Sequence, residues 1–411
     1  MIEHPTPLHP KPTTRLFSLF CLASYLLSMA YGSTFLLSLL MSSHGGNEKN
    51  AGTVISAAMV STFVAVLLSG HLCDRLGAAR SVALCGIALV VANLGFAVSA
   101  SQLQLMMLFG FVLGIGWGVF YTLGPIMVAM MVEPAQRARY FALLSGSMMS
   151  GIGSAPLLGR LASQAGLPVT WAFVIAALAS LTGVLVFWRL AGVLQKLPDQ
   201  SGAVASKLTL AGALSVLRSK AVFAIVMVGL GGAIFGGLSS FQTSYAQARS
   251  LDYSLFFAGF MGAAITGRML VAGIVVKRDP YVMSCLLSGL IVVSVLMFKF
   301  QVSSSLGYLL AAIVLGIGYG LTYSVINGLA ANEAPAGTTT QSLLLFSLSY
   351  FIGVFGFPLL AGKVIVEHGL STMLGILLGV ALLNWLITLA RLMWRSWVSS
   401  DGVTVGERQR P

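Results

Sequence analysis

Twelve apolar stretches, each long enough to cross a lipid bilayer as a helix, divide the chain into two sets of six. The first set occupies residues 16–41, 51–73, 80–100, 104–132, 140–166 and 169–190, and the second occupies residues 221–247, 254–276, 281–300, 305–331, 340–366 and 371–395. A chain with this pattern cannot fold as a soluble domain, because too much apolar surface would face water. We therefore expect an all-α membrane protein with twelve transmembrane helices in two six-helix bundles.

The composition excludes several other classes of protein. Charged residues make up 8% of the 411 residues, whereas a soluble domain has roughly 25%. A cytosolic enzyme, a disordered chain and a small secreted domain are therefore excluded. The net charge of +12 does not indicate a nucleic-acid partner, because the basic residues are scattered between apolar stretches. The cysteines lack metal-ligand spacing, so we expect neither a metal site nor a disulfide at Cys21, Cys73, Cys85 and Cys285.

Polar segments delimit the two predicted bundles, which take residues 16–190 and 221–395. We interpret 191–220 as a linker, 1–15 as an N-terminal tail and 396–411 as a C-terminal tail. Most lysines and arginines fall in these segments or in loops on the same side, and this asymmetry marks the cytoplasmic side. We therefore place the linker and both termini in the cytoplasm, and the chain in the plasma membrane, or in the inner membrane of a Gram-negative cell.

An internal repeat relates the two halves. Leu-Gly-Ile-Gly-Trp-Gly at 113–118, followed by Tyr121, recurs 202 residues later as Leu-Gly-Ile-Gly-Tyr-Gly at 315–320, followed by Tyr323. Two further matches are Pro156-Leu-Leu with Pro358-Leu-Leu at the same offset and, more weakly, residues 70–75 with residues 273–278. Matching tracts in corresponding stretches predict two pseudo-symmetric bundles with a substrate site between them, near the middle of the membrane.

The loop after the second stretch has a distinctive sequence, Gly-His-Leu-Cys-Asp-Arg-Leu-Gly-Ala-Ala-Arg at 70–80. It is similar to the signature loop G-x-x-x-D-R-x-G-x-x-[RK] of the major facilitator superfamily of secondary transporters, and the resemblance extends over essentially the whole chain. The resemblance implies a charged cytoplasmic gate at Asp74, Arg75 and Arg80, with Gly77 allowing a tight turn.

Charged residues after the fourth stretch lie on the same side as this loop. We interpret Glu133 and Arg137 as further gate residues, with ordinary solvated helix ends as the alternative. In the second half, residues 277–279 occupy the corresponding loop without the Asp-Arg-x-Gly order. The resemblance therefore implies a gate in one half of the chain only.

The fifth stretch contains Gly-Ile-Gly-Ser-Ala-Pro-Leu-Leu-Gly-Arg at 151–160. This tract resembles the superfamily's antiporter motif, which is associated with exporters. It departs from that motif at Ala155, before the proline, and at Arg160, in place of the last glycine. Small residues permit close helix packing and proline bends a helix, so either could serve any rocking bundle. The tract favours export without excluding import.

Charges at membrane depth are basic. The acidic residues lie in tails, loops or the ends of stretches, which disfavours a cationic substrate and carboxylate-based proton coupling. Arg268 lies within the eighth stretch, where insertion costs about 2.5 to 3.5 kcal/mol. We interpret it as an anion-binding residue, aided by Arg160 or Lys363, because a planar guanidinium binds carboxylates bidentately. Snorkelling to the interface and a bond to helix carbonyls are the alternatives.

Six uncharged polar residues are further candidates for the substrate site. A buried tyrosine hydroxyl or amide needs a hydrogen-bond partner, and a wet cavity supplies one. Helix packing would explain the aromatic residues equally well. The six candidates are Tyr25, Tyr31, Tyr121, Gln242, Tyr323 and Asn327.

These features together predict a secondary transporter of a small organic solute that works by alternating access. An exporter or antiporter of an anionic or neutral metabolite or drug is favoured, and uptake or exchange of a monocarboxylate-like anion is the alternative. An enzyme is disfavoured because the histidines and acids are peripheral, and a sensor because no loop has room for a soluble domain. We expect no cofactor, since there is no nucleotide-binding loop. The expected partners are the substrate, a proton or counter-solute, and membrane lipid, with the protein acting as a monomer.

Overall fold

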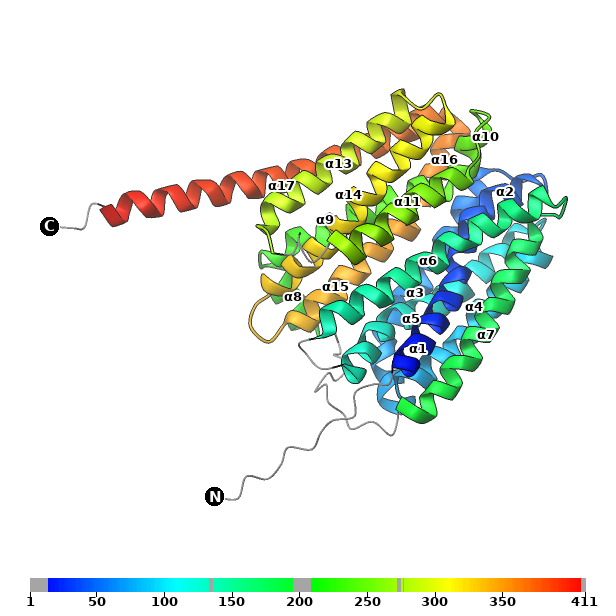
Figure 1. Cartoon of the computed structure of the whole chain (residues 1–411), viewed down its shortest axis with the longest axis horizontal. Helices are drawn as coiled ribbons and strands as arrows, with labels where there is room; N and C mark the ends of the chain where they lie inside the picture. Colours follow the sequence, from blue (N-terminus) through cyan, green and yellow to red (C-terminus); the bar gives the residue numbers. More distant parts are fainter. Residues whose placement is uncertain (1–13, 133–135, 195–207, 272–274, 276, 408–411) are drawn as a thin grey trace, which may run out of the picture.

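Long helices joined by short turns make up the computed structural model (Figure 1). The structure describes residues 14–132, 136–194, 208–271, 275 and 277–407. Among these residues no strand occurs. Eleven described helices are long and apolar enough to cross a membrane, and Ser254–Leu270 is a shorter apolar helix at the place of the eighth predicted stretch. The predicted all-α membrane fold is therefore confirmed.

The first half of the chain forms one bundle, coloured blue to green in Figure 1. Its first span has three consecutive pieces, α1 (Thr14–Gly32), the 3-10 turn η1 (Ser33–Leu36) and α2 (Leu37–Ser42). The other spans are α3 (Glu48–Leu76), α4 (Ala78–Val98), α5 (Leu103–Met131), α6 (Arg137–Gln164) and α7 (Thr170–Leu194). Within this bundle α3 packs on α5, α4 on α7, and α1 on α6.

The second half forms the other bundle. It begins with the short helix α8 (Leu210–Leu217), and its first two spans are α9 (Ala221–Ser240), continued by α10 (Gln242–Gln247), and α11 (Ser254–Thr266), continued by the π-helical turn η3 (Gly267–Val271). The remaining elements are α13 (Pro280–Phe300), α14 (Ser305–Asn332), α15 (Thr339–Phe351), the π-helical turn η4 (Ile352–Gly356), α16 (Phe357–His368) and α17 (Leu370–Glu407). Here α14 packs on α11 and α13, and α9 on α15.

Two helix pairs make the main contacts between the bundles, α3 with α16 and α6 with α11. Figure 1 shows the second pair, with α6 beside α11. The backbones of α3 and α16 approach closely. A Cβ atom added at Gly52 would lie 2.2 Å from the carbonyl oxygen of Pro358, and one added at Gly362 would lie 2.3 Å from that of Glu48. Glycine allows this approach because it has no side chain to separate the backbones.

The repeated glycine series has the same packing role in both bundles. A Cβ atom added at Gly114 of α5 would lie 2.3 Å from the Ala58 carbonyl oxygen of α3. The equivalent atom at Gly316 of α14 would lie 2.4 Å from the Phe260 carbonyl oxygen of α11. The repeat thus sets the same close helix crossing twice, which is the pseudo-symmetry that the sequence predicts.

Capping residues fix several helix starts. Asn47 and Asn50 form a capping box at the start of α3, with backbone-to-side-chain hydrogen bonds of 3.0 and 3.1 Å. The Ser304 side chain caps α14 by accepting a hydrogen bond of 3.2 Å from the Gly307 backbone N–H. Such caps satisfy N–H groups that have no partner within the helix.

Two segments that the sequence assigns to polar connections contain helix. Helix α7 continues to Leu194 and α8 lies inside the predicted linker 191–220, while α17 continues past residue 395 to Glu407. Figure 1 shows α17 extending beyond the bundle, on the side where α1 begins. We call this side the termini end and the other side the opposite end.

Candidate functional site

The π-helical turn η3 places Arg268 at the interface between the bundles. Its side chain is buried, with 5% of the residue exposed. The Nε atom donates a hydrogen bond of 3.0 Å to the Gly320 carbonyl oxygen of α14, and Nη1 donates to Ser145 Oγ on α6 of the other bundle. Because Arg268 contacts both bundles and is covered by them, its charge does not snorkel to the membrane surface.

The partners of Arg268 are neutral. Among the described residues, the ion pairs are Arg160 with Asp252, Arg391 with Glu333, and Arg395 with Asp279. No described carboxylate is within ion-pair distance of Arg268. Burying a guanidinium costs free energy, and neutral hydrogen-bond partners offset only part of that cost. A bound anion would offset the rest.

Two tyrosines meet beside Arg268. The hydroxyl oxygens of Tyr121 on α5 and Tyr323 on α14 are 2.5 Å apart, so they share a hydrogen bond across the bundle interface. The guanidinium carbon of Arg268 lies 5.5 Å from the centroid of the Tyr323 ring, within cation–π range. The structure therefore brings together three of the residues that the sequence selects.

Aromatic rings surround the tyrosine pair. Tyr350 stacks on Tyr121 with centroids 5.9 Å apart and an interplanar angle of 17°, and Phe351 meets Tyr121 edge-on at 5.0 Å. Tyr31 stacks on Trp117 at 4.7 Å. The central aromatic cluster, which spans both bundles, consists of Tyr31, Trp117, Tyr121, Tyr323, Tyr350, Phe351 and Phe355.

Comparison with known families decides the identity of this fold. The sequence matches the model of the Major Facilitator Superfamily over residues 17–358. The chain belongs to the Major Facilitator Superfamily. No curated protein matches its sequence significantly.

Solved structures of other superfamily transporters share the fold. The human organic anion transporter TETRAN is 19% identical with a TM-score of 0.68, covering 92% of this chain and 99% of its own. The peptide transporter POT is also 19% identical, with a TM-score of 0.71 and coverage of 92% and 93%. The nucleoside transporter NupG is 15% identical, with a TM-score of 0.70 and coverage of 91% and 99%. At these identities the likeness concerns the fold alone.

Three other candidates for substrate contact, all in the described part of the chain, have no hydrogen bond to Arg268. Tyr25 donates a hydrogen bond of 2.9 Å to Ser154 Oγ within the first bundle. Gln242 Oε1 accepts one of 2.7 Å from the Tyr308 hydroxyl within the second bundle. Asn327 is partly buried on α14, about one turn from Tyr323. Tyr25 and Gln242 therefore stabilise helix packing inside their own bundles.

Arg160 and Lys363 do not join Arg268. Arg160 Nε lies 2.7 Å from Asp252 Oδ2, linking α6 to the loop before α11 at the opposite end. Lys363 is exposed on α16. Ser38 and Ser244, whose hydroxyl oxygens are 2.8 Å apart, add a second contact between the bundles at the opposite end.

The predicted gate residues lie at the termini end. Asp74, Arg75 and Arg80 are exposed around Gly77, whose φ of +81° forms the turn between α3 and α4. This φ favours glycine because a side chain would be strained there. Glu133 lies outside the described residues.

Arg137 has partners on the preceding helix. Its Nη2 donates a hydrogen bond of 3.1 Å to the Ala129 carbonyl oxygen, and its Nε donates one of 3.3 Å to that of Val132. These acceptors lie in the last turn of α5 and just after it, where helix carbonyls lack partners within the helix. In this structure Arg137 therefore caps α5.

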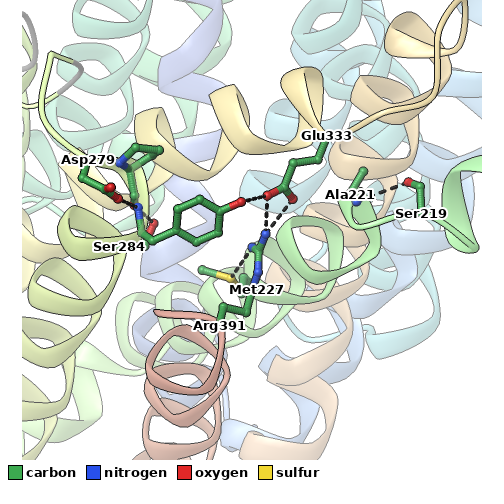
Figure 2. Close-up of polar contacts among 9 residues, drawn as sticks. Ser219, Ala221, Met227, Asp279, Ser284, Glu333 and Arg391 are labelled. Carbon is green, nitrogen blue, oxygen red and sulfur yellow. Dashed lines mark hydrogen bonds and ion pairs between the residues drawn. The ribbon is translucent and has the colours of Figure 1, made fainter. Parts of the chain in front are cut away.

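A buried ion pair joins four helices of the second bundle at its termini end (Figure 2). Arg391 Nη2 of α17 lies 2.5 and 2.6 Å from the carboxylate oxygens of Glu333, the residue that directly follows α14. The Tyr281 hydroxyl of α13 donates to Glu333 Oε1 at 2.5 Å, and Arg391 Nη1 lies 4.0 Å from Met227 Sδ of α9. Arg391 is only 8% exposed, so this pair is largely shielded from water.

Sequence reasoning missed Ser145 and Tyr350, which contact Arg268 and Tyr121. Neither belongs to a repeated tract or a charge pattern. The sequence alone does not distinguish Glu333 and Arg391 from ordinary charges at helix ends. Their contact joins residues that are 58 positions apart in the chain. The one usable signal is that both are charges beside long apolar stretches, where a partner reduces the cost of burial.

Proposed function

We propose that this chain is a secondary active transporter of a small organic solute with one negative charge, which binds between the bundles at Arg268. The observation that supports the proposal is the buried guanidinium of Arg268, which has neutral partners and lies at the bundle interface. A single cation balances a single carboxylate, whereas a dianion would bury one unpaired charge. Ser145 is the partner that an incoming carboxylate would replace at Nη1.

The central aromatic cluster favours a substrate with an apolar, ring-containing body. Tyr121 and Tyr350 present ring faces and edges, and the Tyr121 and Tyr323 hydroxyls provide hydrogen-bonding groups beside the guanidinium. Aromatic side chains bind apolar bodies through large contact areas and ring-edge contacts. One structural neighbour, TETRAN, is described as an organic anion transporter, which accords with this substrate class.

Alternating access is the proposed mechanism. At the opposite end the bundles are held by the Arg160–Asp252 ion pair, the Ser38–Ser244 hydrogen bond and the close contact of Gly52 with Pro358. These contacts would break for the site to open at that end. Substrate binding between the bundles can shift the balance of states only as far as it binds one state better than the other.

Export in exchange for a proton or counter-solute is the proposed direction, with the termini end in the cytoplasm of a plasma or inner membrane. The support is the resemblance of residues 151–160 to the superfamily's antiporter motif. This glycine series of α6 packs closely on α1. A Cβ atom added at Gly151 would lie 2.1 Å from the Tyr25 carbonyl oxygen, and one added at Gly32 would lie 2.1 Å from that of Ile152. Uptake of the same anion is the second candidate, favoured by the Arg160 substitution in this series.

Thermal stabilisation of the purified protein tests the substrate class. The probes are benzoate, phthalate, benzamide and a hydrophobic quaternary ammonium ion. We expect benzoate to stabilise most, and Arg268→Ala to weaken its binding by on the order of ten- to a hundredfold. Arg268→Lys should retain part of the effect, because the charge stays but the planar fork is lost.

The matched control is Lys363→Ala, which removes an exposed cation from the same bundle. It should leave benzoate binding unchanged. If the ammonium ion stabilises best, or if Arg268→Ala responds to benzoate as the parent does, the proposed anion site is wrong. Transport driven by an imposed proton or counter-solute gradient in proteoliposomes of known orientation then distinguishes export from uptake.

A further inference from the structure

Helix α8 lies at the termini end, between the last span of the first bundle and the first span of the second. Its eight residues, Leu210–Leu217, are too few to cross a membrane. Thr209 caps the helix, because its Oγ1 accepts a hydrogen bond of 3.2 Å from the Gly212 N–H. The helix is therefore a defined element of the connection between the bundles.

One face of α8 is fixed to the second bundle. Val216 is fully buried, and Gln341 Nε2 of α15 donates a hydrogen bond of 3.2 Å to Thr209 Oγ1. A Cβ atom added at Gly212 would lie 1.9 Å from the Gln341 side-chain oxygen, so the two helices touch at this point. Helix α15 ends near Tyr350, a member of the central aromatic cluster.

The other face of α8 is an exposed apolar stripe. Leu210, Leu214 and Leu217 are 79%, 45% and 44% exposed, and their i, i+4, i+7 spacing puts them on the same side of the helix. Val216 lies on the opposite side of the helix. We call these three residues the leucine stripe.

Basic and aromatic side chains flank the stripe. Arg218 and Lys220 follow α8 directly and are exposed, and the segment 208–220 contains no acidic residue. Lys220 Nζ lies 5.0 Å from the ring centroid of Trp394, an exposed residue of α17. Tryptophan and lysine together are typical of the level at which lipid headgroups meet the acyl chains.

We propose that α8 is an interfacial helix whose leucine stripe enters the leaflet at the termini end, while Arg218 and Lys220 bind the headgroups of anionic phospholipids. An apolar stripe bordered by cations complements a negatively charged membrane surface. Each basic residue near such a surface adds roughly fivefold to the affinity. The start of α8 is hydrogen-bonded to α15, which supplies Tyr350 to the central aromatic cluster. Lipid bound to α8 therefore also affects the position of α15.

A fluorescent label on Leu214→Cys tests the position of the stripe. The full chain, with its four native cysteines replaced by serine, is reconstituted in phosphatidylcholine with or without phosphatidylglycerol. We expect quenching by a doxyl group on the lipid chain, increased by phosphatidylglycerol, and little quenching by aqueous iodide. A label at Ser215→Cys, on the flank of the same helix, is the matched control and should favour iodide.

Charge removal tests the headgroup contact. Arg218→Gln with Lys220→Gln should lower the apparent affinity for phosphatidylglycerol by more than about tenfold, and Lys363→Gln should not change it. Quenching of the Leu214 label by iodide alone overturns the proposal. Protection from both quenchers overturns it in favour of contact with a second copy of the chain. None of these readouts depends on the transported solute.

Discussion

The hydroxyl oxygens of Tyr121 and Tyr323 lie 2.5 Å apart, and each comes from the same position of one half of the internal repeat. The two bundles thus contribute one identical group each to a single hydrogen bond at their shared interface. Tyr350 and Arg268 contact this pair from the second bundle. Any motion that separates α5 from α14 must break the bond between the two hydroxyls.

Removing either hydroxyl should therefore have the same effect. Tyr121→Phe and Tyr323→Phe each lose one hydrogen bond, worth about 0.5 to 1.5 kcal/mol. The double variant should lose no more than either single variant, because the pair shares one bond. Melting temperatures of the four proteins complete the cycle. Tyr25→Phe, which loses a bond inside the first bundle, should add to either effect, and additive losses for Tyr121 and Tyr323 would count against the shared bond.

The buried pair of Glu333 and Arg391 should dominate the stability of the second bundle. Glu333→Gln or Arg391→Gln leaves one buried charge without its partner, at a cost of about 3 to 5 kcal/mol. The exposed pair is the control, since Arg395→Gln should cost at most about 1 kcal/mol. Thermal unfolding in one detergent gives the ranking. Equal losses at Arg391 and Arg395 would mean that water reaches the Glu333 carboxylate.

The Asp252–Arg160 contact should weaken in acid. Burial raises the pKa of Asp252, but hydrogen bonds from Ser254 and the Arg160 guanidinium lower it more, so the pKa lies below its ordinary value of 3.8. A lowered pKa means that the contact is fully formed above this ordinary value and is lost as pH falls through the lowered one. The cysteine introduced by Ser38→Cys at this buried position should become accessible over that range, as measured with a dithiodipyridine, a disulfide reagent that reacts with thiols in acid.

The matched variants show whether this ion pair is responsible. Arg160→Ala should make the Ser38 cysteine more reactive at neutral pH and remove most of its dependence on acid. Asp252→Asn should behave in the same way, since it removes the charge but keeps the shape. An unchanged acid response in both variants would assign the effect to another group.

Close packing of α3 and α16 should govern the opposite end. Gly52→Ala and Gly362→Ala each place a methyl group too near a carbonyl oxygen of the other bundle, 2.2 and 2.3 Å from it. We expect both variants to separate the bundles there, exposing the Ser38 cysteine, while each bundle stays folded. Gly328→Ala on α14, where nothing lies within 4 Å of the added atom, is the control. If the cysteine introduced by Ser38→Cys stays protected, α3 and α16 shift relative to each other but the bundles do not separate at this end.

Hydropathy alone was enough to predict the spans. A helix that crosses a bilayer needs about 20 apolar residues, because its backbone polar groups cannot bond to water there, and stretches of that length are easy to find in this chain. The repeat identified Tyr121 and Tyr323 as corresponding residues, but only the structure shows that their hydroxyls meet. Arg268 stood out because its charge lies at membrane depth. The sequence could not reveal the contact of Arg268 with Ser145, or that of Arg160 with Asp252, which lies 92 residues further along the chain. Both contacts depend on how the bundles face each other.

The π-helical turn at η3 also makes the two halves of the chain differ. An α-helical turn closes four residues on and a π-helical turn five, so η3 holds one extra residue. At the repeat offset of 202 residues, Arg268 corresponds to Val66, an apolar residue within the regular helix α3. The π-helical turn and its arginine therefore belong to one half alone, and they give two like halves unlike chemistry.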